Sequence, residues 1–323
     1  MSRTIAITGA TGFAGRHAVS ELLLRGVALR ALVRDPAKAG LAAGVETVQG
    51  DLADTAALAR LVNGADAVIH LAGALTAFDR DGYFRVNAEG TRALADAAQK
   101  ARIRRFVHIS SLAAREPQLS AYAASKRAGE EIVTARMGEL NAMIIRPPAV
   151  YGPGDRGTLP LIKELTRPVA AIPGLPEARF SLIHSRDLAR LIAQALDTDA
   201  QGLHEVSDGH PGGYGWSDLL TTASAFRGSP VRPIFLPRPV PAAVARLAEG
   251  FARLTGKPGM VNRGKIAELY HPDWVARPGG PELPDPTPFD RGFAETVTWY
   301  RNAGWLPRGR GADTRTASSR TSS

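Results

Sequence analysis

The sequence has no cysteine and no apolar run long enough to cross a membrane. The lack of cysteine excludes disulfides and thiolate chemistry, and no metal site is predicted. A membrane-spanning helix needs about 18 or more consecutive apolar residues, so no integral membrane segment is expected. A strand pattern begins within a few residues of Met1 and leaves no room for a secretory signal. We therefore expect a cytoplasmic protein.

The charge of the chain is positive but scattered. The 323 residues carry a formal net charge of +9. No basic stripe interleaved with aromatic residues is present, so we expect no nucleic-acid partner. An anionic cofactor and a small-molecule substrate account for the positive charge more simply. The segment 308–323 contains four arginines among Gly, Ser and Thr, and it is predicted to be a disordered basic tail.

Short strand patterns alternate with helical patterns in the first half of the chain. The predicted strands are Thr4–Thr8, Ala28–Arg34, Glu46–Gly50, Ala67–Ala72, Arg105–Ser110 and Ala142–Arg146. The predicted helices are Gly15–Arg25, Thr55–Val62, Phe84–Ala101 and Tyr122–Met137. This alternation predicts an α/β fold, a Rossmann-type doubly wound parallel sheet with helices on both faces. Ligands bind such sheets at the carboxyl ends of the strands.

Proline and glycine become frequent after Arg146. We predict an NAD(P)-binding domain over 1–150 and a smaller, irregular C-terminal substrate lobe over 151–307. The segment 180–200 is expected to return to the first domain. Further predicted elements are the strands Phe180–His184 and Leu203–Ser207 and the helices Arg186–Leu196, Ala242–Leu254 and Arg291–Asn302.

One helical pattern in the lobe carries Val244, Leu247 and Phe251 on one face and Arg246 and Arg253 outside it. Packing of the apolar face on the lobe is the simpler placement, and contact with a membrane surface is the alternative. Other lobe residues each allow two interpretations. The aromatic residues either pack in the lobe or line a pocket, and the charged residues either lie on the surface or line the same pocket. They are Tyr214, Trp216, Phe235, Arg232, Arg263 and Lys265.

The segment from Thr8 to Gly15 is the strongest functional signal. It lies between a predicted strand and a predicted helix. Glycine removes side chains that would block a pyrophosphate, and the helix directs N–H groups and its positive dipole end toward that anion. A simple Gly-rich turn is the alternative, but the flanking elements favour a dinucleotide site. The predicted cofactor-binding residues here are Gly9, Thr11, Gly12, Phe13, Ala14 and Gly15.

A second group combines Ser111 at a strand end with Tyr122 and Lys126 on one face of a helix. The Tyr122 phenol can exchange a proton with a carbonyl or alcohol oxygen. A nearby ammonium would lower its pKa from about 10, and Ser111 can hold the substrate oxygen. Each residue alone is better explained as a surface residue or a cap, and only the glycine segment makes the group informative.

The end of the second predicted strand bears on the choice of cofactor. A carboxylate there accepts from a ribose 2′-hydroxyl, whereas an arginine accommodates a 2′-phosphate. The chain has Arg34 followed by Asp35 and Pro36. We expect Arg34 to bind NADP, with NAD on Asp35 as the alternative.

These motifs resemble those of the extended short-chain dehydrogenases/reductases, the NAD(P)-dependent epimerase/dehydratase-like family. Thr8–Gly15 matches TGxxGxxG and Tyr122–Lys126 matches YxxxK. The resemblance spans residues 3–307 and implies a Rossmann fold with strand order 3-2-1-4-5-6-7 and a small substrate lobe. It implies Ser111, Tyr122 and Lys126 as the catalytic set.

The resemblance also implies further cofactor contacts and a partner. A homodimer formed through the helices that bear Asn87 and Tyr122 is common in the family and is expected here. The remaining cofactor-binding residues that the resemblance implies are Asp51, Leu52, Leu71, Ala72, Gly73, Asn87, Tyr122, Lys126 and Pro147.

Two departures distinguish this chain from sugar-nucleotide epimerases of the family. The short loop after Ser111 lacks their Tyr-Gly pair, and Phe180 stands where an arginine is usual, with Arg179 one step away. Both argue against a diphospho-sugar substrate. The short loop resembles relatives of the accessory subunit of respiratory complex I, although Tyr122 and Lys126 are retained.

Three functions follow from these patterns. The first is an NAD(P)-dependent oxidoreductase that transfers hydride between nicotinamide and a carbonyl or secondary alcohol. The second is an NAD-dependent sugar-nucleotide epimerase/dehydratase. The third is a non-catalytic NAD(P)-binding assembly or redox-sensing protein. The retained Tyr122 and Lys126 favour the first.

Overall fold

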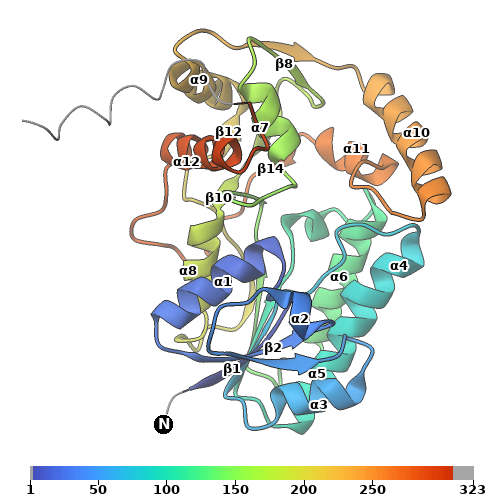
Figure 1. The fold of residues 1–323 in the computed structure, drawn as a ribbon, viewed down its shortest axis with the longest axis vertical. Coiled ribbons are helices and arrows are strands. Elements are labelled where there is room, and N and C mark those ends of the chain that lie inside the picture. The colour runs from blue at the N-terminus through green and yellow to red at the C-terminus, as the bar shows by residue number, and fades with distance from the viewer. Residues whose placement is uncertain (1–2, 308–323) are drawn as a thin grey trace, which may run out of the picture.

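A computed structural model describes residues 3–307, and the predicted tail 308–323 lies outside them. Its centre is a seven-stranded sheet in the order β11-β6-β5-β4-β1-β2-β3, with every neighbouring pair parallel (Figure 1). The strands are β1 Thr4–Thr8, β2 Ala28–Val33, β3 Val45–Gln49, β4 Ala67–His70, β5 Arg105–Ile109, β6 Ala142–Arg146 and β11 Gly202–Glu205. The predicted fold class and strand order are confirmed, with β11 as the seventh strand.

Helices cover both faces of the sheet because the strand side chains alternate. Ile5 and Ile7 face a core shared with α1 and α8, whereas Ala6 faces a core shared with α3, α5 and α6. The helix α8 thus packs with the sheet although it follows part of the lobe in sequence. These helices are α1 Phe13–Leu24, α3 Thr55–Val62, α5 Gly90–Lys100, α6 Ala121–Thr134 and α8 Ser185–Gln194, and the short α2 Pro36–Ala39 follows β2.

The helix before β5 begins earlier than predicted and is interrupted. Its first part, α4 Arg80–Phe84, starts because Asp79 accepts a hydrogen bond from the Gly82 backbone N–H at 2.8 Å. A π-helical turn, Arg85–Glu89, then joins α4 to α5. Such turns are often found at functional sites, and this one carries Asn87.

The smaller lobe lies above the sheet in Figure 1. Its strands are β7 Ala149–Tyr151, β8 Val169–Ile172, β9 Arg179–Phe180, β10 Leu182–His184, β12 Tyr214–Gly215, β13 Arg232–Phe235 and β14 Asp273–Trp274. Its helices are α7 Leu159–Leu165, α9 Trp216–Arg227, α10 Pro239–Thr255, α11 Arg263–Leu269 and α12 Phe289–Asn302. The predicted strand Phe180–His184 is divided, because β9 pairs with β12 and β14 whereas β10 pairs with β7.

Two predictions about packing in the lobe have opposite outcomes. Tyr214 and Trp216 are buried in the lobe core and Phe235 packs against it, as the packing interpretation requires. The expected packing of the Leu247 face of α10 is wrong. Leu247 is 76% exposed, because α10 packs through small residues such as Ala245 instead.

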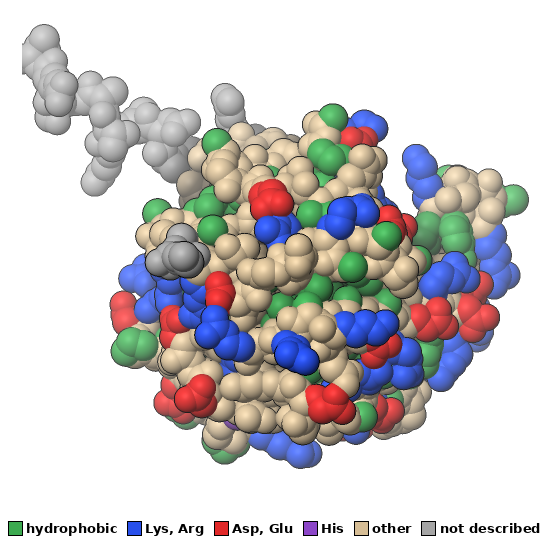
Figure 2. Space-filling model, turned by 90° about the horizontal axis from the view of Figure 1, so that it is seen from below, with side chains coloured by type: hydrophobic (Ala, Val, Ile, Leu, Met, Phe, Trp, Pro, Cys, Tyr) green, Lys and Arg blue, Asp and Glu red, His purple; other side chains and the backbone are tan. Residues whose placement is uncertain are grey.

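Two further observations concern the charges on the surface and the lengths of the helices. Lys and Arg side chains are dispersed among Asp and Glu side chains on the face seen in Figure 2. None of the helices described between residues 3 and 307 combines the length and hydropathy that crossing a bilayer requires.

Candidate active site

Gly9 and Gly15 in the turn after β1 lie too close to neighbouring backbone atoms for any residue with a side chain. Gly9 has a φ of +75°, and a Cβ there would lie 2.5 Å from the Ala72 backbone nitrogen. A Cβ on Gly15 would lie 2.0 Å from the Gly9 carbonyl oxygen. Gly12 is the N-cap of α1 and provides no capping side chain, and the first turn of α1 has no acidic residue. The N–H groups of α1 are therefore available to an anion, as a dinucleotide site requires.

At the end of β2, Asp35 and Arg34 are the two candidates for binding the cofactor's ribose, and they differ in their surroundings. The Asp35 carboxylate caps α2 by accepting from the Ala37 backbone N–H at 3.1 Å, and it also pairs with Lys38 at 2.7 Å. Arg34 is exposed and, within the described part of the chain, has no hydrogen-bond or ion-pair partner. The carboxylate is thus engaged locally, whereas the guanidinium is available.

Asn87 ties the loop after β4 to α6. Its side-chain oxygen accepts from the Ala74 backbone N–H at 2.7 Å, and its amide nitrogen donates to the Ala74 carbonyl at 3.1 Å and to Ser125 Oγ at 2.8 Å. Ser125 Oγ donates in turn to the Tyr122 carbonyl at 2.7 Å. A Cβ on Gly73 would lie 3.1 Å from the Asn87 oxygen. The buried amide therefore sets the distance between this loop and the Tyr122 helix.

Lys126 is buried beneath the same loop. Its Nζ donates to the Ile109 carbonyl at 2.8 Å, and a Cβ built on Gly73 would lie 3.8 Å from it. Burial lowers the pKa of Lys126 to about 8, against the opposing effect of the Glu130 carboxylate. The ammonium thus lies between the end of β5 and the loop after β4, where the carboxyl ends of the strands meet.

Tyr122 lies in the first turn of α6, which Ser120 caps by accepting from the Ala123 backbone N–H at 2.9 Å. Burial raises the pKa of Tyr122 to about 12, and a hydrogen bond with Ser111 acts in the opposite direction. The expected lowering by an ammonium is therefore wrong for this structure, because burial dominates and Lys126 is not among the groups that shift the phenol.

Ser111 performs the capping role that the sequence left as an alternative, and it also acts to lower the pKa of the Tyr122 phenol. Its Oγ accepts from the Ala113 backbone N–H at 3.2 Å at the start of the 3-10 turn Leu112–Arg115. The Leu112 N–H donates to the Pro147 carbonyl at 2.8 Å, so the loops after β5 and β6 are joined. Of the other predicted residues, Asp51 accepts from the Ala53 N–H at 2.8 Å beside the end of β3.

A buried histidine was not predicted. His70 Nδ1 lies 2.7 Å from Thr8 Oγ1, and His70 Nε2 lies 2.9 Å from Thr91 Oγ1. Thr91 donates to the Asn87 carbonyl at 2.7 Å, so it can only accept from His70. Burial lowers the pKa of His70 to about 3, and the neutral ring joins β1, β4 and α5.

A buried ion-pair network lies below Tyr122 and Lys126. Arg146 Nε and Nη2 donate to the two oxygens of Glu130 at 2.7 and 2.6 Å. Ser110 Oγ donates to Glu130 at 2.6 Å, and Arg146 Nη1 donates to Glu205 at 3.3 Å. A bidentate pair of this kind is geometrically specific. The network fixes α6 to β5, β6 and β11.

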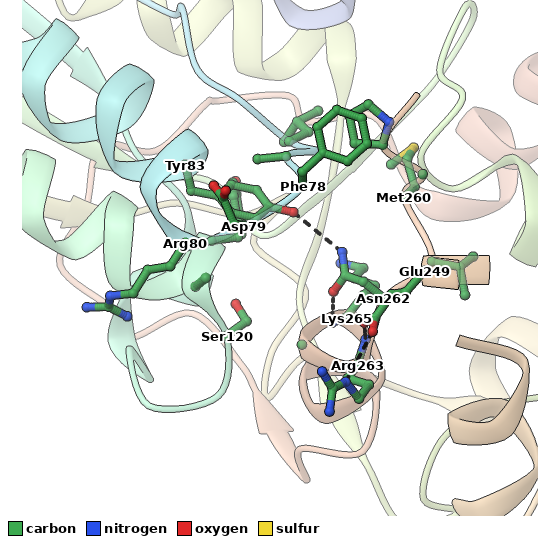
Figure 3. Close-up of a pocket in the computed structure, with 18 of the residues that line it drawn as sticks. Phe78, Asp79, Arg80, Tyr83, Ser120, Glu249, Met260, Asn262, Arg263 and Lys265 are labelled. Atoms are coloured by element: carbon green, nitrogen blue, oxygen red, sulfur yellow. Dashed lines mark hydrogen bonds and ion pairs between the residues drawn. The ribbon is translucent and has the colours of Figure 1, made fainter. Parts of the chain in front are cut away.

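A cavity of about 560 Å³ opens over Tyr122 between the sheet domain and the lobe. Figure 3 shows Tyr83 and Ser120 on one side and Asn262 and Lys265 on the other. The Asn262 amide donates to the Tyr83 hydroxyl at 3.4 Å across the cavity. The sequence offered no motif for Tyr83 or Asn262, because they approach each other only through the lobe.

The three charged lobe residues that the sequence analysis offered as pocket lining differ in their position relative to the cavity. Arg263 and Lys265 line the cavity, where each pairs with a carboxylate, whereas Arg232 is exposed on β13 and is not among the lining residues. Large apolar residues at the cavity are solvent-exposed and form its rim. They are Leu75, Phe78, Met260 and Val261.

The fold and this site define a class of protein. Residues 5–207 match the model of the NAD dependent epimerase/dehydratase family, and the chain belongs to that family. It is accordingly an NAD(P)-dependent enzyme of the oxidoreductase or epimerase type.

The chain is similar to several particular proteins. The chain is 44% identical over 310 residues to a ceramide reductase of Caulobacter vibrioides, with 94% of this chain and 96% of that protein covered. It is 27% identical over 339 residues to sterol demethylase protein B of Methylococcus capsulatus, with 94% and 100% covered. The crystal structure of gox2253 matches with a TM-score of 0.72 at 26% identity, with 95% of this chain and 100% of that chain covered. MoeE5 in complex with UDP-glucose and NAD matches with a TM-score of 0.65 at 21% identity, with 94% and 99% covered, and shows the fold alone.

Proposed function

We propose that this chain is an NADP-preferring reductase that converts a ketone of a long-chain, ceramide-class lipid into a secondary alcohol. The observation that carries the proposal is the position of Tyr122, with Ser111 beside it, at a cavity whose rim is apolar. An apolar rim suits acyl chains. The similarity to a ceramide reductase over nearly the whole chain supports the same substrate class.

The residues present fit a dinucleotide. The glycine turn, Arg34, Asp51, Leu52, the Leu71–Gly73 loop, Asn87, Lys126 and Pro147 are proposed to hold it. When bound, the cofactor supplies hydride to the carbonyl carbon. Tyr122 would donate its phenolic proton to the carbonyl oxygen, and Ser111 would orient that oxygen. A pKa of about 12 keeps the phenol protonated at neutral pH, which is the state that reduction consumes.

A further observation argues against a diphospho-sugar. The guanidinium of Arg179, one residue from the place where epimerases carry arginine, donates to the Gly212 carbonyl at 2.9 Å and to the Gly213 carbonyl at 2.6 Å. It is thus used within the lobe. Homodimerisation through the helices of Asn87 and Tyr122 stays a prediction.

The direct test is turnover. The full chain is incubated with NADPH and a keto-ceramide in detergent micelles, and the product is measured by mass spectrometry. We expect one alcohol formed for each NADPH oxidised. Tightly bound NAD with no net consumption and an epimerised sugar nucleotide would contradict the proposal and support the epimerase. No hydride transfer to any ketone would support the non-catalytic alternative.

Replacing Arg34 tests the cofactor preference. We expect Arg34→Ser to raise the dissociation constant of NADPH about thirtyfold, because a hydrogen bond between charged groups contributes about 2 kcal/mol. Binding of NADH should not change. Thermal shift with both nucleotides measures the effect. Lys38→Ser, which removes a neighbouring cation already paired with Asp35, is the control. Equal losses for NADPH and NADH would show that Arg34 does not read the phosphate.

A further inference from the structure

Helix α10 presents its large apolar side chains to solvent. Val240, Val244, Leu247, Phe251 and Leu254 are 49%, 55%, 76%, 66% and 87% exposed. They recur at spacings of four and three residues and therefore form one stripe along the helix, here named the α10 stripe. A contiguous exposed apolar surface of this kind marks a site of interaction with another protein or with a membrane.

The other side of α10 explains why the helix keeps this orientation. Pro241 and Ala245 are buried. The Glu249 carboxylate, which lines the cavity, accepts from the Arg263 backbone N–H at 2.8 Å and pairs with its Nε at 3.2 Å. Figure 1 shows α10 at the outer edge of the lobe, beside α11. The α10 stripe cannot turn inward without losing these contacts.

Basic residues accompany the α10 stripe. Arg238, Arg246, Arg253 and Lys257 are exposed, whereas Glu249 is the single acidic residue of α10 and is already paired. Cations beside an apolar helical stripe are attracted to anionic lipid headgroups, and such a helix lies in the plane of the interface. We infer that the α10 stripe docks this protein on the surface of a bilayer that contains anionic phospholipid.

The cavity rim continues from the α10 stripe. Met260 and Val261 follow α10, line the cavity and are 41% and 45% exposed. Leu75 and Phe78, from the loop before α4, line the same cavity and are 63% and 51% exposed. Docking brings this rim to the acyl chains, so that a lipid enters the cavity without crossing water. This last step rests on the proposed function, whereas docking rests on α10 alone.

Vesicle flotation tests the docking. The full chain is mixed with vesicles of phosphatidylglycerol and phosphatidylethanolamine, or of phosphatidylcholine alone. We expect partition into the anionic vesicles to be at least about tenfold stronger, and to weaken with salt. The double variant Leu247→Asp/Phe251→Asp should lose at least about tenfold in partition. Leu24→Asp changes a leucine that is 86% exposed at the end of α1, and it should bind as the wild type does.

The outcomes separate docking from catalysis. Wild-type protein that does not float, or a double variant that floats equally well, overturns the docking. A dimer that the double variant dissociates, with no vesicle binding, shows instead that the α10 stripe is a subunit interface. The double variant should still reduce a water-soluble short-chain ketone at the wild-type rate. A chain that floats but reduces no ketone overturns only the proposed function.

Discussion

The variant Tyr122→Phe is expected to reduce ketones about 10²–10⁴-fold more slowly than the wild type. The substitution removes only the hydroxyl that donates the proton, so the aromatic ring still fills its place beside Tyr83, at 6.2 Å between ring centroids. NADPH binding should stay nearly unchanged, because the glycine turn, Asn87 and Lys126 are untouched. Single-turnover kinetics and a thermal shift with NADPH measure the two quantities separately.

Tyr83→Phe is the matched control, since it removes a second phenolic hydroxyl from the same cavity. We expect it to change kcat far less.

The pH profile of ketone reduction gives another readout. With a pKa of about 12 the Tyr122 phenol stays protonated, whereas Lys126, at about 8, loses its charge as the pH rises. Because Lys126 is proposed to hold the dinucleotide, wild-type reduction should decline above about pH 8. If Tyr122→Phe kept its full rate, the proton would have to come from elsewhere.

The variant Glu130→Ala is expected to lower the free energy of unfolding by about 3–5 kcal/mol, because it leaves the buried Arg146 guanidinium without its bidentate partner. Glu130 and Arg146 are 2% and 6% exposed, so water cannot replace the lost carboxylate. Ser110 Oγ would lose its acceptor as well. Denaturant titration measures the change.

Glu131→Ala provides the comparison, since it removes the same side chain one position later, on the exposed side of α6. It should change stability by less than about 0.5 kcal/mol. Because Glu130 also opposes the lowering of the Lys126 pKa, Glu130→Ala should shift the decline of the pH profile to lower pH. Equal stability of the two variants would mean that the Arg146 pair contributes little.

Much of the fold was predictable because it depends on local patterns. The strand–helix alternation and the glycine turn are encoded within short windows, and the parallel direction of the strands follows from that alternation. The order of the strands followed from the family resemblance. The division of Phe180–His184 into β9 and β10 was not predictable, because each half pairs with strands that are distant in sequence. The early start of α4 was missed because the capping side chain of Asp79 lies in a loop without an apolar period.

The candidate site also has features that residue spacing predicts and features that depend on the tertiary structure. The pairing of Tyr122 with Lys126 is a matter of helical spacing, but their pKa values depend on burial. Neighbouring charge alone therefore predicted the wrong direction of the pKa shift of the Tyr122 phenol. For the α10 stripe, the spacing was again visible in the sequence, but the orientation of the helix was not. The side that faces the protein depends on the fit of small residues such as Ala245 against the lobe.

The sequence by itself determined the parallel sheet and the position of the dinucleotide turn, since these depend on strand–helix alternation, on glycines and on residue spacing, and its motifs determined the family, whose resemblance implied the sheet order. The tertiary structure alone decided what surrounds them. Burial shifted the pKa values of Tyr122 and Lys126, the lobe brought Asn262 opposite Tyr83, and packing left Leu247 in solvent. The physical reason is that desolvation and long-range contact depend on residues far apart in the chain, which no short window of sequence contains.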